Sequence, residues 1–286
     1  MAIYNLGSIN IDHIYRVPHL PAPGETLAAT SYAVGLGGKG ANQSVAAARG
    51  GARTFHIGAV GAEGGWTCRA LVDFGVDVTH VAQRSTPTGH AIINVDPKAE
   101  NSIVLYPGAN LTLTDADIAA ALAGAVKGDT LLLQNETSGQ AVAARLAAKK
   151  AMRVIYSAAP FDLAAVKAVL ADVSLLVMNE GEAQALRNGL GGLPQVDVVV
   201  TRGAQGADWI SVGGDPIHVS AFPVSPVDTT GAGDCFLGTM AAALDAGISR
   251  TQAMRRAAAA AALQVTRQGA SPAMPTAAEV DAFLKS

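Results

Sequence analysis

The chain has 286 residues, a formal net charge of −3 and only 15% charged residues. This length allows one large α/β domain or two small ones, while the low charge leaves no basic face that could bind nucleic acid. No apolar run approaches the roughly 20 residues that a membrane span needs. Strand-like residues begin almost at Met1, which leaves no room for a secretory signal. We therefore expect a cytoplasmic protein that has neither nucleic acid nor a membrane among its partners.

Short apolar runs alternate with amphipathic or alanine-rich segments along the chain. The expected strands are residues 3–6, 54–60, 130–133, 153–156, 175–178 and 196–201. The expected helices are residues 39–49, 64–74, 138–150, 161–171, 180–188, 231–246, 250–267 and 276–284. Continuous β-branched runs separated by helices are typical of a parallel sheet covered on both faces. The pattern therefore predicts a doubly wound α/β fold.

Two segments interrupt this alternation and predict a small separate sheet. Residues 12–34 are rich in proline, and residues 89–107 alternate apolar and polar side chains around 89–95 and 102–106. Such alternation is typical of strands with one open face. We expect both segments to form a lid subdomain that projects from the core and closes over a bound ligand. Because no linker divides the remainder, residues 1–286 are expected to form a single domain.

The two cysteines, Cys68 and Cys235, lie on separate predicted helices. They are expected to be small core residues and not a disulfide, as in a protein of a reducing compartment. The six histidines lack metal-binding spacing, so a structural metal is not indicated.

A glycine-rich turn opens a long apolar helix in the segment Asp228-Thr229-Thr230-Gly231-Ala232-Gly233-Asp234-Cys235-Phe236. Backbone N–H groups at such a helix start, together with the helix dipole, favour an anion. Asp234 lies one turn into the helix, where its carboxylate could take a proton from an alcohol. An anion site beside a base is what phosphoryl transfer to a hydroxyl requires. The alternative is an ordinary strand-to-helix turn with Asp228 as the N-cap.

A second glycine-rich segment precedes the first predicted helix and reads Gly35-Leu36-Gly37-Gly38-Lys39-Gly40-Ala41-Asn42-Gln43. It matches the dinucleotide fingerprint GxGxxG, but that fingerprint follows the first buried strand of a βαβ unit. This segment instead follows the polar residues 29–34. A nicotinamide-dependent Rossmann oxidoreductase is therefore kept only as an alternative of another class. A P-loop is excluded, because position 33 is alanine and position 40 is glycine.

Together the two motifs resemble the paired signatures of the PfkB carbohydrate kinases, and within that family those of the ribokinases. The resemblance covers nearly the whole chain, from Gly7 to Ala270. It implies a ribokinase-like, doubly wound, mostly parallel α/β fold with helices on both faces and a β-sheet lid over the sugar. It also implies transfer of the γ-phosphoryl group of ATP to a primary hydroxyl of a pentose, with D-ribose favoured. The implied partners are the sugar, ATP and a second copy of the chain, bound through the lid as a homodimer.

The resemblance also implies a set of catalytic and sugar-binding residues. Asp234 would be the catalytic base, and the N–H groups of Gly231, Ala232 and Gly233 would neutralise the transferred phosphoryl group. A carboxylate can accept from two sugar hydroxyls, and a glycine lets the backbone approach a polyol closely. The implied sugar-binding residues are Asn10, Asp12, Gly37, Gly38, Lys39, Asn42, Glu136 and Asp234.

Nucleotide and metal sites are implied in the same way. The implied nucleotide-binding residues are Asn179, Thr201, Gly203, Gly206, Gly231 and Gly233. Asn179 and Glu182 would hold Mg²⁺ through water, although the residues alone also fit a helix capping box. The implied ligands of a monovalent cation are backbone oxygens at Asp228, Thr230, Arg267 and Gly269, with Gln264 on the same loop. Because Ala273 stands where the family commonly has a serine, we expect a weakened potassium site.

Several alternatives remain open on the sequence. Fructose, 2-keto-3-deoxygluconate or a nucleoside could replace ribose. Arg16 could face a sugar acid, and Tyr15 and Tyr32 are the nearby aromatic side chains that a nucleoside would need. A sugar-binding regulator without catalysis is disfavoured by the intact Asp234. The compact segments 187–195 and 213–226 indicate a shallower or differently lined adenine pocket.

Overall fold

The computed structural model describes residues 1–98 and 100–285. Its strands are β1 (Ala2–Leu6), β2 (Asn10–Arg16), β3 (Ser31–Gly37), β4 (Arg53–Val60), β5 (Asp77–Gln83), β6 (Gly89–Val95), β7 (Asn101–Tyr106), β8 (Thr130–Gln134), β9 (Arg153–Ser157), β10 (Leu175–Asn179), β11 (Asp197–Thr201), β12 (Ala207–Ile210) and β13 (Ile217–Val219). Its α-helices are α1 (Lys39–Arg49), α2 (Gly65–Asp73), α3 (Asp115–Ala121), α4 (Gln140–Lys149), α5 (Leu163–Val169), α6 (Glu180–Leu190), α7 (Ala232–Asp245), α8 (Arg250–Val265) and α9 (Ala277–Phe283).

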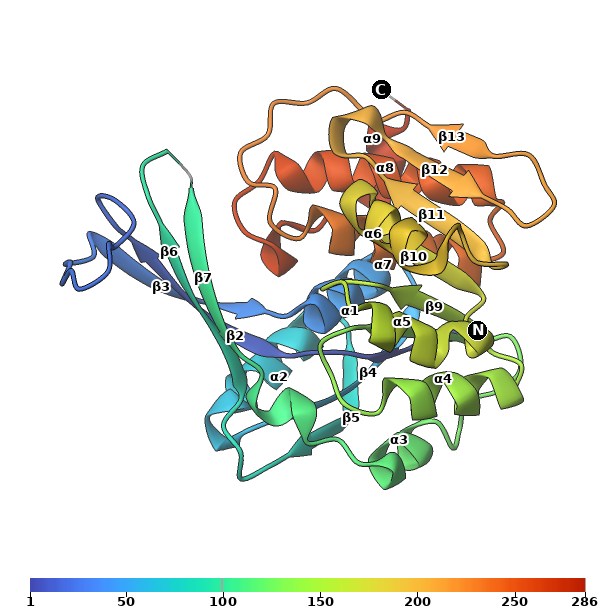
Figure 1. Ribbon diagram of the computed structural model, residues 1–286, viewed down its shortest axis with the longest axis horizontal. Coiled ribbons are helices and arrows are strands. Elements are labelled where there is room, and N and C mark those ends of the chain that lie inside the picture. Colours follow the sequence, from blue (N-terminus) through green and yellow to red (C-terminus); the bar gives the residue numbers. More distant parts are fainter. Residues whose placement is uncertain (99, 286) are drawn as a thin grey trace.

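The core of the molecule is a twisted, mostly parallel sheet (Figure 1). Within the described residues it has nine strands in the order β13-β12-β11-β10-β9-β8-β1-β4-β5. All neighbours from β11 to β5 pair in parallel, and only β12 and β13 join antiparallel at one edge. The chain therefore winds outward in both directions from β1 and β8, and this predicted doubly wound fold is confirmed.

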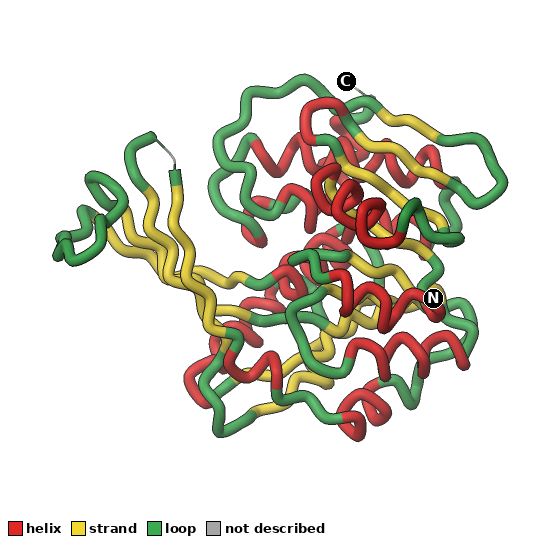
Figure 2. Tube along the Cα trace, viewed as in Figure 1, coloured by secondary structure: helices red, strands yellow, loops and turns green. Residues whose placement is uncertain are grey.

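Helices cover both faces of this sheet, as Figure 2 shows. On one face, α3, α4, α5 and α6 pack their apolar side chains on the strands. On the other face, α1, α7 and α8 cover the middle of the sheet, while α2 and α9 extend the same layer. Strands covered on both faces are mostly apolar, and β1, β8 and most of β10 are indeed buried.

A second, four-stranded sheet projects from this core (Figure 1). Its order is β3-β2-β6-β7, with β2 and β6 parallel and both outer pairs antiparallel. It is built from the two segments that were expected to form a separate sheet. Its strands bury little, and every residue of β7 is exposed.

The structure departs from the sequence-based elements mainly at short or marginal segments. The expected helices and strands of the core are present with shifts of one to a few residues at their ends. Helix α3 and the edge strand β5 were not predicted. Helix α3 has only seven residues, and β5 mixes polar and apolar side chains without a buried run. Such segments carry little periodicity to detect.

Three observations concern the cysteines, metal-binding clusters and membrane-spanning helices. Cys68 and Cys235 are free thiols on α2 and α7. Within residues 1–98 and 100–285, histidine, cysteine and acidic side chains form no cluster that could hold a metal ion. In the same part of the chain, no helix combines the length and apolarity that crossing a bilayer requires.

Candidate active site

The two glycine-rich motifs meet because helices α1 and α7 pack unusually closely. A Cβ atom on Gly238 of α7 would lie 2.5 Å from both Ala46 Cβ and Gln43 O of α1. A Cβ atom on Gly40, in the first turn of α1, would lie equally close to the backbone of Gly7 at the end of β1. Small residues at these contacts let the backbones approach. The starts of both helices therefore lie beside the carboxyl end of β1, where ligands bind in open α/β sheets.

The carboxylate of Asp234 is held by two amides from α1. Asn42 Nδ2 donates to Asp234 Oδ2 at 3.1 Å, and Gln43 Nε2 donates to Asp234 Oδ1 at 2.9 Å. Burial raises the pKa of Asp234 to about 6, although the Lys39 charge and the two amides oppose that rise. The side chain is thus a fixed carboxylate with a pKa near neutrality, as a general base requires.

A buried network of hydrogen bonds holds Gln43, one of the two donors to this carboxylate, in place. Gln43 Oε1 accepts from Gln134 Nε2 at 2.7 Å, and the same nitrogen donates to Asn5 Oδ1 at 2.8 Å. Asn5 in turn donates to Ser44 Oγ at 2.8 Å. Ser44 contacts His56 Nδ1 at 2.8 Å, and His56 Nε2 lies 3.1 Å from Gly7 O. Since a carbonyl only accepts, His56 must donate from Nε2 and accept at Nδ1.

The helix start before Asp234 has the geometry of an anion site. Gly231 is the N-cap of α7 in the left-handed conformation, with φ of +80°. The Ala232 N–H turns back to Thr229 O at 3.2 Å, so the anion-facing role expected for that group falls to its neighbours. Gly233 is exposed and a Cβ there would meet no atom within 4 Å, so this turn has open space beside it for a ligand. Asp228 as the N-cap is wrong, because Asp228 Oδ1 instead accepts from Thr230 N in the preceding turn.

Two further carboxylates lie near each other. Asp12 is at the base of the lid, and Glu136 is at the edge of the core sheet where β8 ends. Burial and the neighbouring Glu136 charge raise the pKa of Asp12 to about 6. Glu136 Oε2 accepts from Ser8 Oγ and, at 3.1 Å, from the backbone N–H of Lys39. These carboxylates are oriented for hydroxyl groups.

The glycines of the first motif are required by the protein itself. A Cβ on Gly37 would lie 2.1 Å from Asp12 Oδ2, so the atom that requires a glycine here belongs to the Asp12 side chain of the protein. Gly38 has φ of +95°, and its Cβ would lie 2.8 Å from Ser8 O. Both glycines therefore let strand β3 and helix α1 close around Asp12 and Ser8.

The structure adds residues that the sequence reasoning did not single out. Asn110 Nδ2 donates to Asn10 Oδ1 at 2.8 Å and so orients that amide. Ser271 Oγ donates to Asn42 Oδ1 at 2.6 Å. Gln43 stood within the quoted motif, where a polar residue on an otherwise small and apolar buried face was the available signal. For Ser8, Asn110 and Ser271 no comparable signal exists, because their partners lie 100 or more residues away.

A pocket of about 540 Å³ adjoins the start of α7. Four of the six expected nucleotide-binding residues line it: Thr201, Gly203, Gly206 and Gly233. Asn179 and Gly231 do not line it. The rest of the wall is mainly apolar and comes from residues 221–226 and from α8: Ala221, Phe222, Pro223, Val224, Pro226, Ala258, Ala261, Ala262 and Val265. An apolar slot beside an anion site suits a base joined to phosphates.

Asn179 and Glu182 form the capping box of α6. Asn179 Oδ1 accepts from Glu182 N at 2.9 Å, and Glu182 Oε2 accepts from Asn179 N at 2.8 Å. Burial raises the pKa of Glu182, while the hydrogen bond from the Asn179 backbone N–H and the charge of Lys39 oppose the rise. The Lys39 charge lowers the pKa of both Asp234 and Glu182 and therefore acts on both carboxylates.

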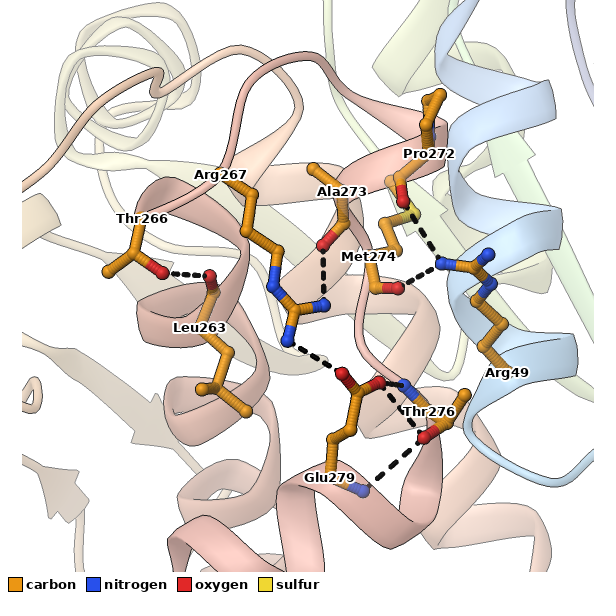
Figure 3. A network of polar contacts seen from close by, with 9 residues as sticks. All are labelled: Arg49, Leu263, Thr266, Arg267, Pro272, Ala273, Met274, Thr276 and Glu279. Carbon is orange, nitrogen blue, oxygen red and sulfur yellow. Dashed lines mark hydrogen bonds and ion pairs between the residues drawn. The ribbon is translucent and has the colours of Figure 1, made fainter.

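The residues implied as monovalent-cation ligands also come together. Asp228 Oδ2 accepts from Gly269 N at 3.0 Å, which joins the turn before α7 to the loop after α8. Gln264 Nε2 donates to Thr230 O at 2.8 Å and to Gly269 O at 3.0 Å. The Arg267 side chain leads away, to Ala273 O and Glu279 (Figure 3).

Comparison with known proteins identifies the family. Residues 3–277 match the protein family described as "pfkB family carbohydrate kinase". A ribokinase of Haemophilus influenzae is 37% identical over 303 residues, covering 98% of this chain and 97% of the relative. A deoxyribokinase of Salmonella typhi is 32% identical and covers 99% of both. The structure of Arabidopsis thaliana ribokinase complexed with ribose and ATP superposes with a TM-score of 0.87 at 31% identity, over all of both chains.

The match spans the motifs, the fold and nearly the full length, so a nicotinamide-dependent oxidoreductase is no longer an alternative. An enzyme of this family transfers a phosphoryl group to a sugar hydroxyl and binds ATP. The chain belongs to the pfkB family of carbohydrate kinases, and its fold is that of the ribokinases.

Proposed function

We propose that this enzyme phosphorylates the primary hydroxyl of D-ribose with ATP and releases ribose 5-phosphate and ADP. One contact carries the proposal: Asn42, from the sugar-binding set, donates to Asp234 at 3.1 Å, beside the open helix start. This contact links the proposed sugar-binding residues to the proposed catalytic base and to the phosphate site at the start of α7. The ribose and ATP bound by the Arabidopsis thaliana ribokinase support the same pair of substrates.

In the proposed reaction Asp234 accepts the proton of the hydroxyl while that oxygen attacks the γ-phosphorus. The bond from the γ-phosphorus to the β,γ-bridging oxygen breaks, and ADP leaves. The N–H groups of Gly231 and Gly233 and the Lys39 ammonium neutralise charge on the transferred group. The Asn42 and Gln43 amides hold the Asp234 carboxylate in place during this transfer.

Sugar binding is assigned to the groups around the carboxylates. Asp12 and Glu136 accept from ring hydroxyls, and the oriented Asn10 and Asn42 amides add donors. Gly37 and Gly38 keep the backbone close to this site. Thr201, Gly203 and Gly206 bind the nucleotide in the adjoining pocket, with Asn179 beside it.

Magnesium fits this site as a partner of the ATP phosphates. Mg²⁺ keeps several waters and takes few carboxylates from a protein. Glu182 is the carboxylate best suited to this role, because the capping box uses only one of its two oxygens, Oε2. Bound there through water, the ion would neutralise phosphate charge. The monovalent cation does not fit in the same way, because Thr230 O and Gly269 O already accept from Gln264.

The assembly and the lid belong to the same proposal. We assign residues 1–286 to one kinase domain whose small sheet closes over the sugar, and a homodimer that pairs these sheets. Large apolar side chains exposed on β3, β6 and β7 support pairing: Tyr32, Val34, Ile92, Ile103, Val104, Leu105 and Tyr106. Light scattering of the purified protein tests the dimer, and Ile103→Lys should yield monomers.

Two free thiols support a cytoplasmic location.

The decisive experiment is a coupled ADP-release assay across ribose, 2-deoxyribose, fructose, 2-keto-3-deoxygluconate, adenosine and inosine. We expect the highest kcat/KM with ribose. Tyr15 and Tyr32 stack on each other with ring centroids 4.9 Å apart, which leaves them a poor open slot for a nucleoside base. A higher kcat/KM with any other acceptor would overturn the ribose assignment and keep the sugar kinase.

A further inference from the structure

The loop after α8 contains a buried amide at a place where the resemblance implied a potassium ion. Gln264 is the next-to-last residue of α8 and is fully buried, with 0% of its surface exposed. Its Nε2 donates to Thr230 O at 2.8 Å and to Gly269 O at 3.0 Å. An amide nitrogen has two hydrogens, so both are used. These two carbonyls are among the oxygens that a monovalent cation would need.

The orientation of this amide is fixed by the same contacts. Among the described residues, Gln264 Oε1 has no hydrogen-bond partner. Turning the amide over would place Oε1 against two carbonyl oxygens, and no donor would then separate the three. A buried acceptor without a partner is destabilising, and the contacts of Nε2 must offset that cost.

The Asp228 carboxylate beside these two carbonyls also accepts from protein donors. Asp228 Oδ1 accepts from Thr230 N at 2.9 Å, and Asp228 Oδ2 accepts from Gly269 N at 3.0 Å and Gln268 Nε2 at 2.9 Å. Ala273 offers no side-chain oxygen, and its carbonyl accepts from the Arg267 guanidinium (Figure 3). Two carbonyls of the implied cation shell and the carboxylate beside them are therefore hydrogen-bonded within the protein.

We propose that the Gln264 side chain replaces the monovalent cation in tying the turn before α7 to the loop after α8, beside the contacts that Asp228 makes to the same loop. This proposal rests on the proposed function, since that turn leads directly into the anion site at Gly231 and Gly233. The enzyme should then need no potassium. Gln264 is a positioning residue, because it acts on the phosphate site through Thr230 and touches no substrate.

The test compares KCl with tetramethylammonium chloride at equal ionic strength, using thermal unfolding without substrates and ADP release with ribose. Wild type should give the same Tm and kcat in both salts. Gln264→Ala should lose at least about tenfold in kcat in tetramethylammonium, and potassium should raise both its kcat and its Tm, as a ligand of the folded state does. Gln264→Ala with Ala273→Ser, which adds a hydroxyl, should respond at lower potassium concentrations.

Gln252→Ala is the matched control, because Gln252 lies exposed on the same helix. It should match wild type in both salts. Potassium-dependent Tm in wild type would overturn the proposal, as would Gln264→Ala behaving like Gln252→Ala. Should Gln264→Ala be inactive in both salts, its Tm decides: a rise with potassium supports the proposal and no rise overturns it. Absence of activity with ribose in wild type would count against the proposed function alone, since the Tm comparison needs no substrate.

Discussion

Gln43 Nε2 donates to Asp234 Oδ1 at 2.9 Å, and Gln43 is itself held by Gln134. The amide of Gln43 therefore has one orientation only, with its oxygen toward Gln134 and its nitrogen toward the carboxylate. A buried carboxylate without such donors would favour its protonated form. This contact thus keeps Asp234 both oriented and ionised.

We predict that Gln43→Leu lowers kcat by about 10- to 100-fold, since the carboxylate loses a donor and its fixed orientation. The Gln43 hydrogen bond lowers the pKa of Asp234 against the larger effect of burial. Removing it raises that pKa, so the acid limb of the kcat–pH profile should move to higher pH. Full pH profiles with ribose test this. Gln184→Leu, at an exposed glutamine of α6, is the control, and an unshifted acid limb in Gln43→Leu would exclude this role.

Removing the base itself should be far more severe. We predict that Asp234→Asn lowers kcat by about 10²–10⁴ or more, because general-base catalysis and substrate orientation are both lost. The sugar Kd should change by less than about tenfold, since Asp12 and Glu136 remain. Single-turnover kinetics and calorimetric titration with ribose measure the two effects. A variant with more than about a tenth of wild-type kcat would show that another group takes the proton.

The fold was predictable from the sequence because its strands are covered on both faces and read as continuous apolar runs. The candidate site was predictable only where a motif carried it. Asp234 and Asn42 could be named, but the contact between them depends on the close approach of α1 and α7 at Gly238. The pairing of Asn10 with Asn110 and of Gln264 with Thr230 joins segments whose spacing carries no local signal. Long-range hydrogen bonds of this kind follow from tertiary packing alone.

The pKa of Asp234 also predicts a pH dependence of stability. The folded-state pKa of about 6 lies above the ordinary aspartate pKa of 3.8, so this group stabilises the fold fully below pH 3.8 and loses that contribution as pH rises through 6. The loss amounts to about 2–3 kcal/mol by linkage. Asp12 acts in the same direction, whereas the lowered pKa of His56, about 4 because of burial, acts in the opposite one.

Because these groups overlap, we predict a difference between proteins. The change in unfolding free energy from pH 4.5 to pH 7.5, measured with urea and without substrates, should be more favourable to the folded state in Asp234→Asn than in wild type, by about 1–2 kcal/mol. Asp115→Asn, in the exposed first turn of α3, serves as the control. Equal changes in wild type and Asp234→Asn would show that burial does not raise this pKa.

Gly37 gives a test of the sugar site that spares the base. A Cβ there would lie within 2.2 Å of the Asp12 carboxyl atoms, so Gly37→Ala must displace Asp12. We predict a rise in the KM for ribose of about tenfold or more, with the KM for ATP nearly unchanged. Gly35→Ala is the matched control, because a Cβ at Gly35 of the same strand meets no atom within 4 Å. Equal KM values for ribose in both variants would remove Asp12 from the sugar site.

The last prediction concerns the hydroxyls that Asp12 recognises. Burial and the Glu136 charge raise the pKa of Asp12, and a hydroxyl that donates to this carboxylate would relieve both effects. Deleting one such hydroxyl leaves a desolvated lone pair without a donor, which costs about 1–3 kcal/mol, or about 5- to 150-fold in affinity. We therefore expect 2-deoxyribose to be a clearly poorer substrate than ribose.

Asp12→Ala should erase most of that difference, since the unpaired acceptor is then gone. The measurement is kcat/KM for ribose and 2-deoxyribose in wild type and variant, which forms a double-mutant cycle between Asp12 and the 2-hydroxyl. Asp73→Ala, at an exposed residue that ends α2, controls for a general effect of losing a carboxylate. A preference for ribose that survives in Asp12→Ala would place the 2-hydroxyl against another residue. Equal use of both sugars by wild type would instead align this enzyme with the deoxyribokinase of Salmonella typhi, which is 32% identical to it.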